Sequence, residues 1–129
     1  MLDIVIVNWN SGHYLHDCLE SIATASLEGF KLGRVVVVDN ASSDDSLKGI
    51  NSLSIPLEII SNAKNKGFGA ACNQGAAICE SKYNLFLNPD TILFNNSLIS
   101  PIKFMEQETS RDFGICGIQL LDDKNKIVR

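Results

Sequence analysis

The chain has 129 residues and a formal charge of −4 at pH 7, which is the size of one ordinary domain with a single buried core. Hydrophobic residues make up 45% of the chain and charged residues 20%, and these values exclude collagen-like, disordered and strongly charged proteins. The excess of acidic residues argues against nucleic acid as a partner, because its binding relies on positive charge.

The four cysteines, Cys18, Cys72, Cys79 and Cys116, lack the CxxC spacing of zinc sites, and we expect them to be small, buried, apolar residues. Residues 1–7 carry neither a basic region nor a small-residue cleavage site, so no signal peptide is expected. No apolar run reaches the roughly 18 residues of a transmembrane span. These features favour a cytoplasmic location, either free or peripheral at the inner face of the membrane.

Short apolar runs alternate with segments of helical period, which predicts strands buried on both faces and joined by crossover helices. The expected fold class is α/β, as a Rossmann-like, three-layer α/β/α domain with a mostly parallel sheet. Strands are predicted over Leu2–Val7, Val35–Val38, Leu57–Ile60, Tyr83–Leu87 and Gly114–Leu121. After a turn over 122–126, Ile127–Val128 begins a returning strand, so the chain is expected to stop within a hairpin.

Helices are predicted between these strands. The first is expected to begin behind Ser11 as its N-cap and to repeat apolar residues over 15–22. The second is expected to begin at the serines at 42–43, with the aspartates at 44–45 in its first turn, where the helix dipole favours negative charge. A weaker helix is predicted over 98–105.

The helix after the third strand carries a stripe of mostly small residues, which lets it lie unusually close to the sheet. The stripe comprises Phe68, Ala71, Cys72, Gly75, Ala76 and Cys79. Asn73 lies beside it, where an asparagine is locally unfavourable and therefore indicates a polar contact. The loop over 65–69 opens this helix, but Cys72 replaces the last glycine of a GxGxxG motif, so it is not a dinucleotide-binding loop.

Polar segments follow four of the predicted strands, at 8–12, 39–42, 62–69 and 88–90. In an open parallel sheet, ligands bind beyond the carboxyl ends of the strands, because loops and helix N-termini converge there. We therefore favour a binding site over helix capping as the explanation for these four polar segments. Asp39, which follows four valines, would stand at this edge and accept a hydrogen bond from an imide N–H or a ribose hydroxyl.

The fourth polar segment is Asn88-Pro89-Asp90. Pro89 keeps Asn88 extended, so the side chains at 88 and 90 point the same way, beyond the strand end. A carboxylate beside an amide can hold a hard divalent cation that also binds a diphosphate. The alternative is an Asx-Pro turn that only ends the strand, and the local pattern does not decide between these two interpretations.

Four motifs together indicate a family. They are IVIVNWNSGHYLHDCLESI, VVVVDNASSDDS, NKGFGAACNQGA and NLFLNPDTIL. In that order and at those spacings they resemble the amino-terminal half of a family 2 glycosyltransferase of the GT-A fold, most closely its rhamnosyltransferase-like branch. The resemblance covers essentially the whole chain. It implies a single GT-A nucleotide-sugar-binding domain over residues 1–129, as the N-terminal part of a longer, bacterial-type enzyme.

The resemblance also implies site residues. Donor nucleotide binding falls on Asn8, Asp39, Asn65, Gly67, Asn73 and Asn88. Within this set, Asn8 and Asp39 would hold the nucleobase and ribose. Asp90 corresponds to the last aspartate of the family's Asp-x-Asp motif and would bind Mg²⁺ or Mn²⁺, whereas Asn88 stands in place of the first aspartate. That replacement removes one negative charge from the expected metal site.

The implied reaction is inverting transfer from a nucleotide-diphospho-sugar, such as dTDP-rhamnose or a UDP-sugar, to a glycan or lipid-linked acceptor in cell-surface polysaccharide synthesis. The resemblance implies that the catalytic base lies beyond residue 129, in an acidic motif, so the chain alone is expected to be inactive. Asp122 and Asp123 have turn composition and are not assigned as the base. The alternative is a non-catalytic α/β nucleotide-binding or signalling module. A phospho-acceptor receiver would need an acidic pair at the first strand end, where this chain has Asn8-Trp9-Asn10.

Overall fold

The structure is a computed structural model that describes residues 1–122, 124 and 126–127. Within these residues, one parallel sheet has the strand order β3-β2-β1-β4. Its members are β1 (Leu2–Asn8), β2 (Leu32–Asp39), β3 (Leu57–Ser61) and β4 (Tyr83–Leu87). The first four predicted strands are therefore confirmed, although β2 begins three residues earlier than its run of valines.

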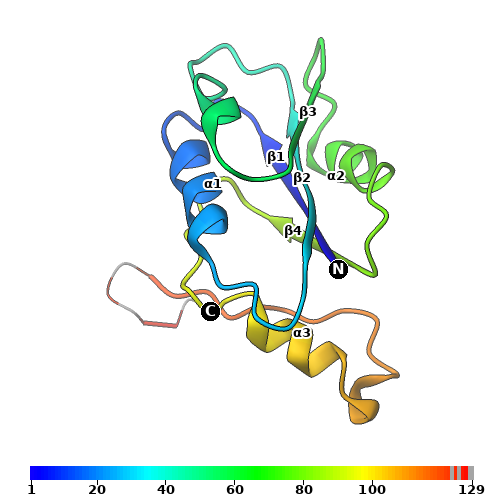
Figure 1. Cartoon of the computed structure of the whole chain (residues 1–129). Coiled ribbons are helices and arrows are strands. Elements are labelled where there is room, and N and C mark those ends of the chain that lie inside the picture. The colour runs from blue at the N-terminus through cyan, green and yellow to red at the C-terminus, as the bar shows by residue number, and fades with distance from the viewer. Residues whose placement is uncertain (123, 125, 128–129) are drawn as a thin grey trace.

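Helices cover both faces of the sheet, which confirms the three-layer prediction. The elements are α1 (Tyr14–Thr24), α2 (Phe68–Ala76), α3 (Ile99–Met105) and two short 3₁₀ turns, η1 (Ile50–Ser52) and η2 (Glu108–Ser110). Figure 1 shows α1 and α2 on opposite sides of the sheet, with α3 beyond the end at which β1 starts. Because strand residues alternate, Ile4 and Ile6 pack on the α1 side, whereas Val5 and Val7 pack on the α2 side.

The close approach of α2 to the sheet is confirmed at Gly75. A Cβ atom at this position would lie 2.5 Å from Val5 Cγ1 and 3.1 Å from Val38 Cγ2. Both distances are shorter than ordinary van der Waals contact, so only glycine fits here without a shift of the neighbours. Ala71 is also buried, whereas Phe68 is 59% exposed at the start of the helix.

The amino end of the sheet is held by a buried carboxylate. Asp3 is 1% exposed, and its Oδ1 accepts hydrogen bonds from Arg34 N and Ser81 Oγ, each at 2.7 Å. Its Oδ2 accepts from Glu80 N at 2.8 Å and Ser81 N at 3.0 Å. Burial alone would raise the pKa of Asp3, but these hydrogen bonds outweigh it and lower the pKa to about 2. A Cβ at Gly33 would overlap Asp3 Oδ1.

Three predictions about local structure are wrong. Residues 41–49 form no helix, and only the 3₁₀ turn η1 follows them. Ser11 is not the N-cap of α1, because the helix begins behind His13 without a side-chain capping bond. Residues 114–120 belong to no strand; Leu121 and Ile127 form one antiparallel bridge, closed by a 2.8 Å bond from Asp122 N to Lys126 O. Val128 lies outside the described residues.

All four cysteines are free thiols. Cys18 is fully buried, but Cys72, Cys79 and Cys116 are only partly buried, so the expectation of burial is correct for Cys18 alone. Of the helices in the described part of the chain, none is both long and apolar enough to cross a membrane.

Candidate functional site

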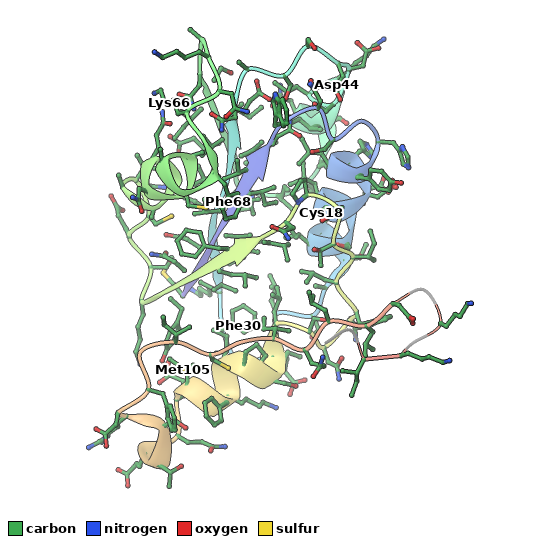
Figure 2. The ribbon with its side chains drawn as sticks, turned by 180° about the vertical axis from the view of Figure 1, so that it is seen from behind. Cys18, Phe30, Asp44, Lys66, Phe68 and Met105 are labelled. Carbon is green, nitrogen blue, oxygen red and sulfur yellow. The ribbon has the colours of Figure 1, made fainter. Side chains whose placement is uncertain are left out.

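The polar segments that follow the strands meet at the carboxyl edge of the sheet. Figure 2 shows Asp44, after β2, and Lys66, before α2, at the same end of the molecule, while Phe30 and Met105 lie toward the opposite end. The register of the two central strands places Asn8 beside Asp39. The sequence-based expectation that these segments share one edge is therefore met by the structure.

Asn8 and Asp39 form a buried pair at the ends of β1 and β2. Asn8 is 0% exposed and Asp39 is 5% exposed, and Asn8 Nδ2 donates to Asp39 Oδ1 at 2.8 Å. The same amide nitrogen lies 3.1 Å from Ser42 Oγ and 2.8 Å from Ser46 Oγ. Asp39 Oδ2 accepts a 3.2 Å bond from Ser42 N. Through these hydrogen bonds, the buried pair holds the segment after β2 in place.

One atom of this pair is unsatisfied. Asn8 Oδ1 is buried and has no hydrogen-bond partner among the residues that the structure describes. Leaving a buried acceptor unpaired costs about 1–3 kcal/mol, so such atoms are uncommon outside functional or water-binding sites. The position of this acceptor, at the carboxyl edge of the central strand, agrees with a role in the candidate site.

Hydrogen bonds to the loop after β1 explain why residues 41–46 are not helical. Asn10 N donates to Ser42 Oγ at 2.9 Å, and Asn10 Oδ1 accepts from Ser43 N at 2.8 Å. Asp44 Oδ2 accepts from Gly12 N at 2.8 Å. A 2.6 Å bond from the Ser46 hydroxyl to Asp44 Oδ1 is the main cause of the lowered pKa of Asp44.

Backbone strain marks the same two loops. Asn10 has a φ of 53° and Ala41 has a φ of 67°, in the left-handed region that side chains disfavour. A non-glycine residue in this region costs about 1 kcal/mol and persists only where the surroundings fix it. Ala41 follows the buried residues Asp39 and Asn40 directly, so the strained backbone lies beside the candidate site.

On the α2 side of the edge, four amide side chains form what we call the amide cluster: Asn40, Asn62, Asn65 and Gln74. Asn40 is 2% exposed and Asn62 is 7% exposed. The cluster joins the end of β2, the loop over residues 62–67 and helix α2. Sequence reasoning placed Asn65 in the site but missed the other three members. The available signal was strand alternation, because Asn40 must point to the face opposite Asp39.

Two of the predicted pocket residues shape the start of α2. Asn65 Oδ1 accepts a 2.8 Å bond from Gly67 N, which closes a tight turn. Gly67 has φ 86° and ψ 158°, a combination that only glycine adopts readily. Asn73 is exposed on α2, and the polar contact expected of it belongs instead to its neighbour Gln74, which pairs with Asn62.

Asn88 and Asp90 follow β4 and are both exposed. The Asn88 carbonyl accepts from Thr91 N at 3.2 Å and from the Cys18 thiol at 3.6 Å. Burial raises the pKa of Cys18 to about 12, and the negative charge of Asp90 adds to this shift. The Cys18 thiol thus stays protonated at neutral pH and keeps donating to the turn that carries Asp90.

The residues after β4 fit a hard divalent cation. Asp90 offers a carboxylate and Asn88 an amide oxygen, and among the described residues neither side chain has a hydrogen-bond partner that would compete. Mg²⁺ and Mn²⁺ favour oxygen ligands, and Mg²⁺ is commonly held by one or two protein oxygens together with substrate phosphates and water. This donor set therefore suits a cation that arrives with a diphosphate.

A parallel sheet with polar loops at its carboxyl edge and a glycine-containing turn before a helix defines the class of open α/β domains, which bind ligands at this edge. The sequence also matches the family described as Glycosyl transferase family 2 over residues 3–118. The chain therefore belongs to glycosyltransferase family 2.

Relatives and solved structures agree with this assignment. A protein of Rickettsia bellii described as an uncharacterized glycosyltransferase is 28% identical, and the match covers 97% of this chain but 18% of that protein. A similarly described protein of Haemophilus influenzae is 24% identical, with 92% of this chain and 49% of that protein covered. This chain thus spans less than half of the length of either relative.

Two solved structures share the fold. S. aureus TarS 1–349 in complex with UDP-GlcNAc has a TM-score of 0.73 at 23% identity, covering 81% of this chain and 31% of that one. The mannosyltransferase PcManGT from Pyrobaculum calidifontis, in complex with GDP-Man and Mn²⁺, has a TM-score of 0.76 at 18% identity, covering 84% and 33%. The GT-A-like α/β fold is therefore established for this chain.

Proposed function

We propose that the chain is the donor-binding part of an inverting glycosyltransferase of the rhamnosyltransferase-like branch. Its donor would be a nucleotide-diphospho-sugar, such as dTDP-rhamnose or a UDP-sugar. Its acceptor would be a glycan or lipid-linked hydroxyl in cell-surface polysaccharide synthesis. Residues 1–129 would form one nucleotide-sugar-binding domain of a longer protein, in keeping with the partial coverage of the relatives.

The observation that carries the proposal is the arrangement of the carboxyl edge. Asn8 and Asp39 pair at the centre, the amide cluster lies on the α2 side, and the exposed Asp90 follows the edge strand β4. The two solved structures that share the fold were determined with a nucleotide sugar, and one of them also with Mn²⁺. The same edge in this chain offers oxygen and amide groups suited to a nucleobase, a ribose and a metal-bound diphosphate.

In the proposed mechanism the chain's residues bind and orient the donor. Asn8 and Asp39 fix the segment after β2 against the nucleobase and ribose, and Asn65, Gly67 and Asn73 line the sugar-nucleotide pocket with Asn88. Asp90 would hold Mg²⁺ or Mn²⁺, and the ion would supply positive charge that stabilises the diphosphate leaving group. The base that deprotonates the acceptor would lie beyond residue 129. Asp122 is occupied in a turn, accepting from Lys124 N at 2.9 Å, and Asp123 lies outside the described residues.

The proposal is tested by isothermal titration of the chain with UDP, GDP and dTDP in the presence of Mn²⁺. We expect one of the three nucleotides to bind, and Asp90→Asn to weaken its Mn²⁺-dependent binding by about tenfold or more, because a metal ligand loses its charge. Asp39→Ala should also weaken binding, and circular dichroism would show whether that variant stays folded.

Asp112→Asn is the matched control, since it removes one exposed carboxylate outside the candidate site. It should bind like the wild type. A folded wild-type chain that binds none of the three nucleotides would refute the donor-site assignment. Equal Mn²⁺-dependent affinities for the wild type and Asp90→Asn would refute the role of Asp90.

A further inference from the structure

Asn40 makes a closed set of hydrogen bonds at the end of β2. Its Nδ2 donates to Asn65 Oδ1 at 2.9 Å and to the Gly67 carbonyl at 3.3 Å. Its Oδ1 accepts from Lys66 N at 3.0 Å and from Asn62 Nδ2 at 3.2 Å. All the partners belong to the 62–67 loop, and Asn40 itself is 2% exposed. One side chain thus satisfies polar groups at four positions of this loop.

The two backbone partners fix the orientation of the Asn40 amide. Lys66 N can only donate and the Gly67 carbonyl can only accept, so Oδ1 must face the first and Nδ2 the second. Aspartate at this position would place an acceptor against the Gly67 carbonyl, and alanine would leave both backbone groups unpaired. The position therefore requires an amide with the shape of asparagine.

The same cluster reaches helix α2. Asn62 and Gln74 exchange a reciprocal pair of amide hydrogen bonds, each 3.0 Å long. Asn62 N also donates to the Asp39 carbonyl at 2.9 Å, which continues the β2–β3 ladder. Residues 63–70 are exposed and lie outside the hydrophobic core, so packing contributes little to their shape. The amide cluster is the main constraint that the described residues place on this loop.

We propose that Asn40 is a positioning residue of the donor site. It holds the 62–67 loop and the first turn of α2 in the conformation that receives a nucleoside diphosphate, without touching the reacting atoms. This inference rests on the proposed function for its binding consequence, but its structural part, the hold of Asn40 on the loop, stands independently.

Amide hydrogen exchange and nucleotide titration of the chain test the two parts. In Asn40→Asp, exchange at Lys66 and Gly67 should accelerate by about tenfold or more, because the new carboxylate oxygen would face two other acceptors, Asn65 Oδ1 and the Gly67 carbonyl, and so displace the loop. The affinity for the nucleotide that the wild type binds best among UDP, GDP and dTDP with Mn²⁺ should fall by about tenfold. Exchange within β1 should stay unchanged, which separates loop release from global unfolding.

Two isosteric variants serve as controls. Asn65→Asp keeps the acceptor that Asn40 Nδ2 and Gly67 N both use, so exchange in the loop should stay slow, the opposite of the result for Asn40→Asp. Asn51→Asp introduces the same charge at an exposed position in η1 and should change neither exchange nor binding.

Three outcomes would overturn parts of the proposal, and they can be told apart. Unchanged loop exchange in Asn40→Asp would show that Asn40 does not hold the loop. Accelerated exchange with unchanged nucleotide affinity would show that the loop conformation is irrelevant to binding. If the wild type binds no nucleotide, the proposed function and the binding consequence fail together, while the exchange result still decides the structural part.

Discussion

At the residue scale, Asp3 shows how a buried charge is made stable. Its carboxylate accepts four hydrogen bonds at the amino end of the sheet, three of them from backbone N–H groups. The ionised form is therefore the favoured one, and the low pKa of about 2 expresses this preference. Asp3 connects the start of β1 with β2 and with the turn before β4.

Asp3→Asn should lower the free energy of unfolding by about 2 kcal/mol at neutral pH, because an amide nitrogen would face backbone donors. The pKa of Asp3 is lowered on folding, so its stabilisation is present above about pH 4 and is lost as the pH falls toward 2. The difference between wild type and variant should shrink over the same pH range. Urea unfolding at several pH values measures this difference, and a constant difference from pH 7 to pH 2 would contradict the assignment.

At the element scale, α2 can pack closely on the sheet because Gly75 has no side chain. Gly75→Ala should lower the free energy of unfolding by about 2 kcal/mol, because the new methyl group overlaps Val5 in a packed core. Gly69→Ala is the matched variant in the same helix, since a Cβ there meets open space. It should raise stability by about 0.5 kcal/mol through helix propensity. Thermal or urea unfolding measures both changes, and equal effects of the two substitutions would rule out close packing as the cause.

The sequence predicts those elements whose cause is local. The apolar runs of β1 and β4 and the small-residue stripe of α2 carry their own signal, and these elements are where the pattern puts them. The expected helix after β2 fails because Ser42, Ser43 and Asp44 bond to a loop about 32 residues earlier in the chain. The run over 114–121 resembles a strand, but among the described residues it lacks the neighbouring strand that a β ladder requires.

The residues of the candidate site also divide into those with a local sequence signal and those without one. Asp39 and Asn65 stand out in the sequence because a buried strand and a glycine-rich loop flank them. Asn40 and Gln74 do not stand out, because their importance arises from contacts with residues 12 to 27 positions away. The tested part of the prediction is that strand ends converge at one edge; the roles assigned to individual residues there remain predictions.

At the scale of the whole molecule, stability is concentrated in the two central strands. Every residue of β1 is buried, as are residues 35–39 of β2, whereas nearly all of residues 111–122 are exposed. Amide exchange of the wild-type chain should therefore be slowest in β1 and β2, near the limit set by global unfolding, and fastest over 114–120. Comparable protection of 114–120 and β1 would contradict this ranking.

The position of Asp3 and Asn8 on one strand has an evolutionary consequence. With a rise of roughly 3.3 Å per residue, the two side chains are separated by roughly 17 Å along β1. One end of the strand secures folding through Asp3, and the other carries the candidate donor site through Asn8. Under the proposed function, substitutions in the loops at the carboxyl end would alter which sugar nucleotide is accepted, while the amino end preserves the scaffold. Sequence divergence among relatives should accordingly fall unevenly along the same strand, with the two ends under different selection.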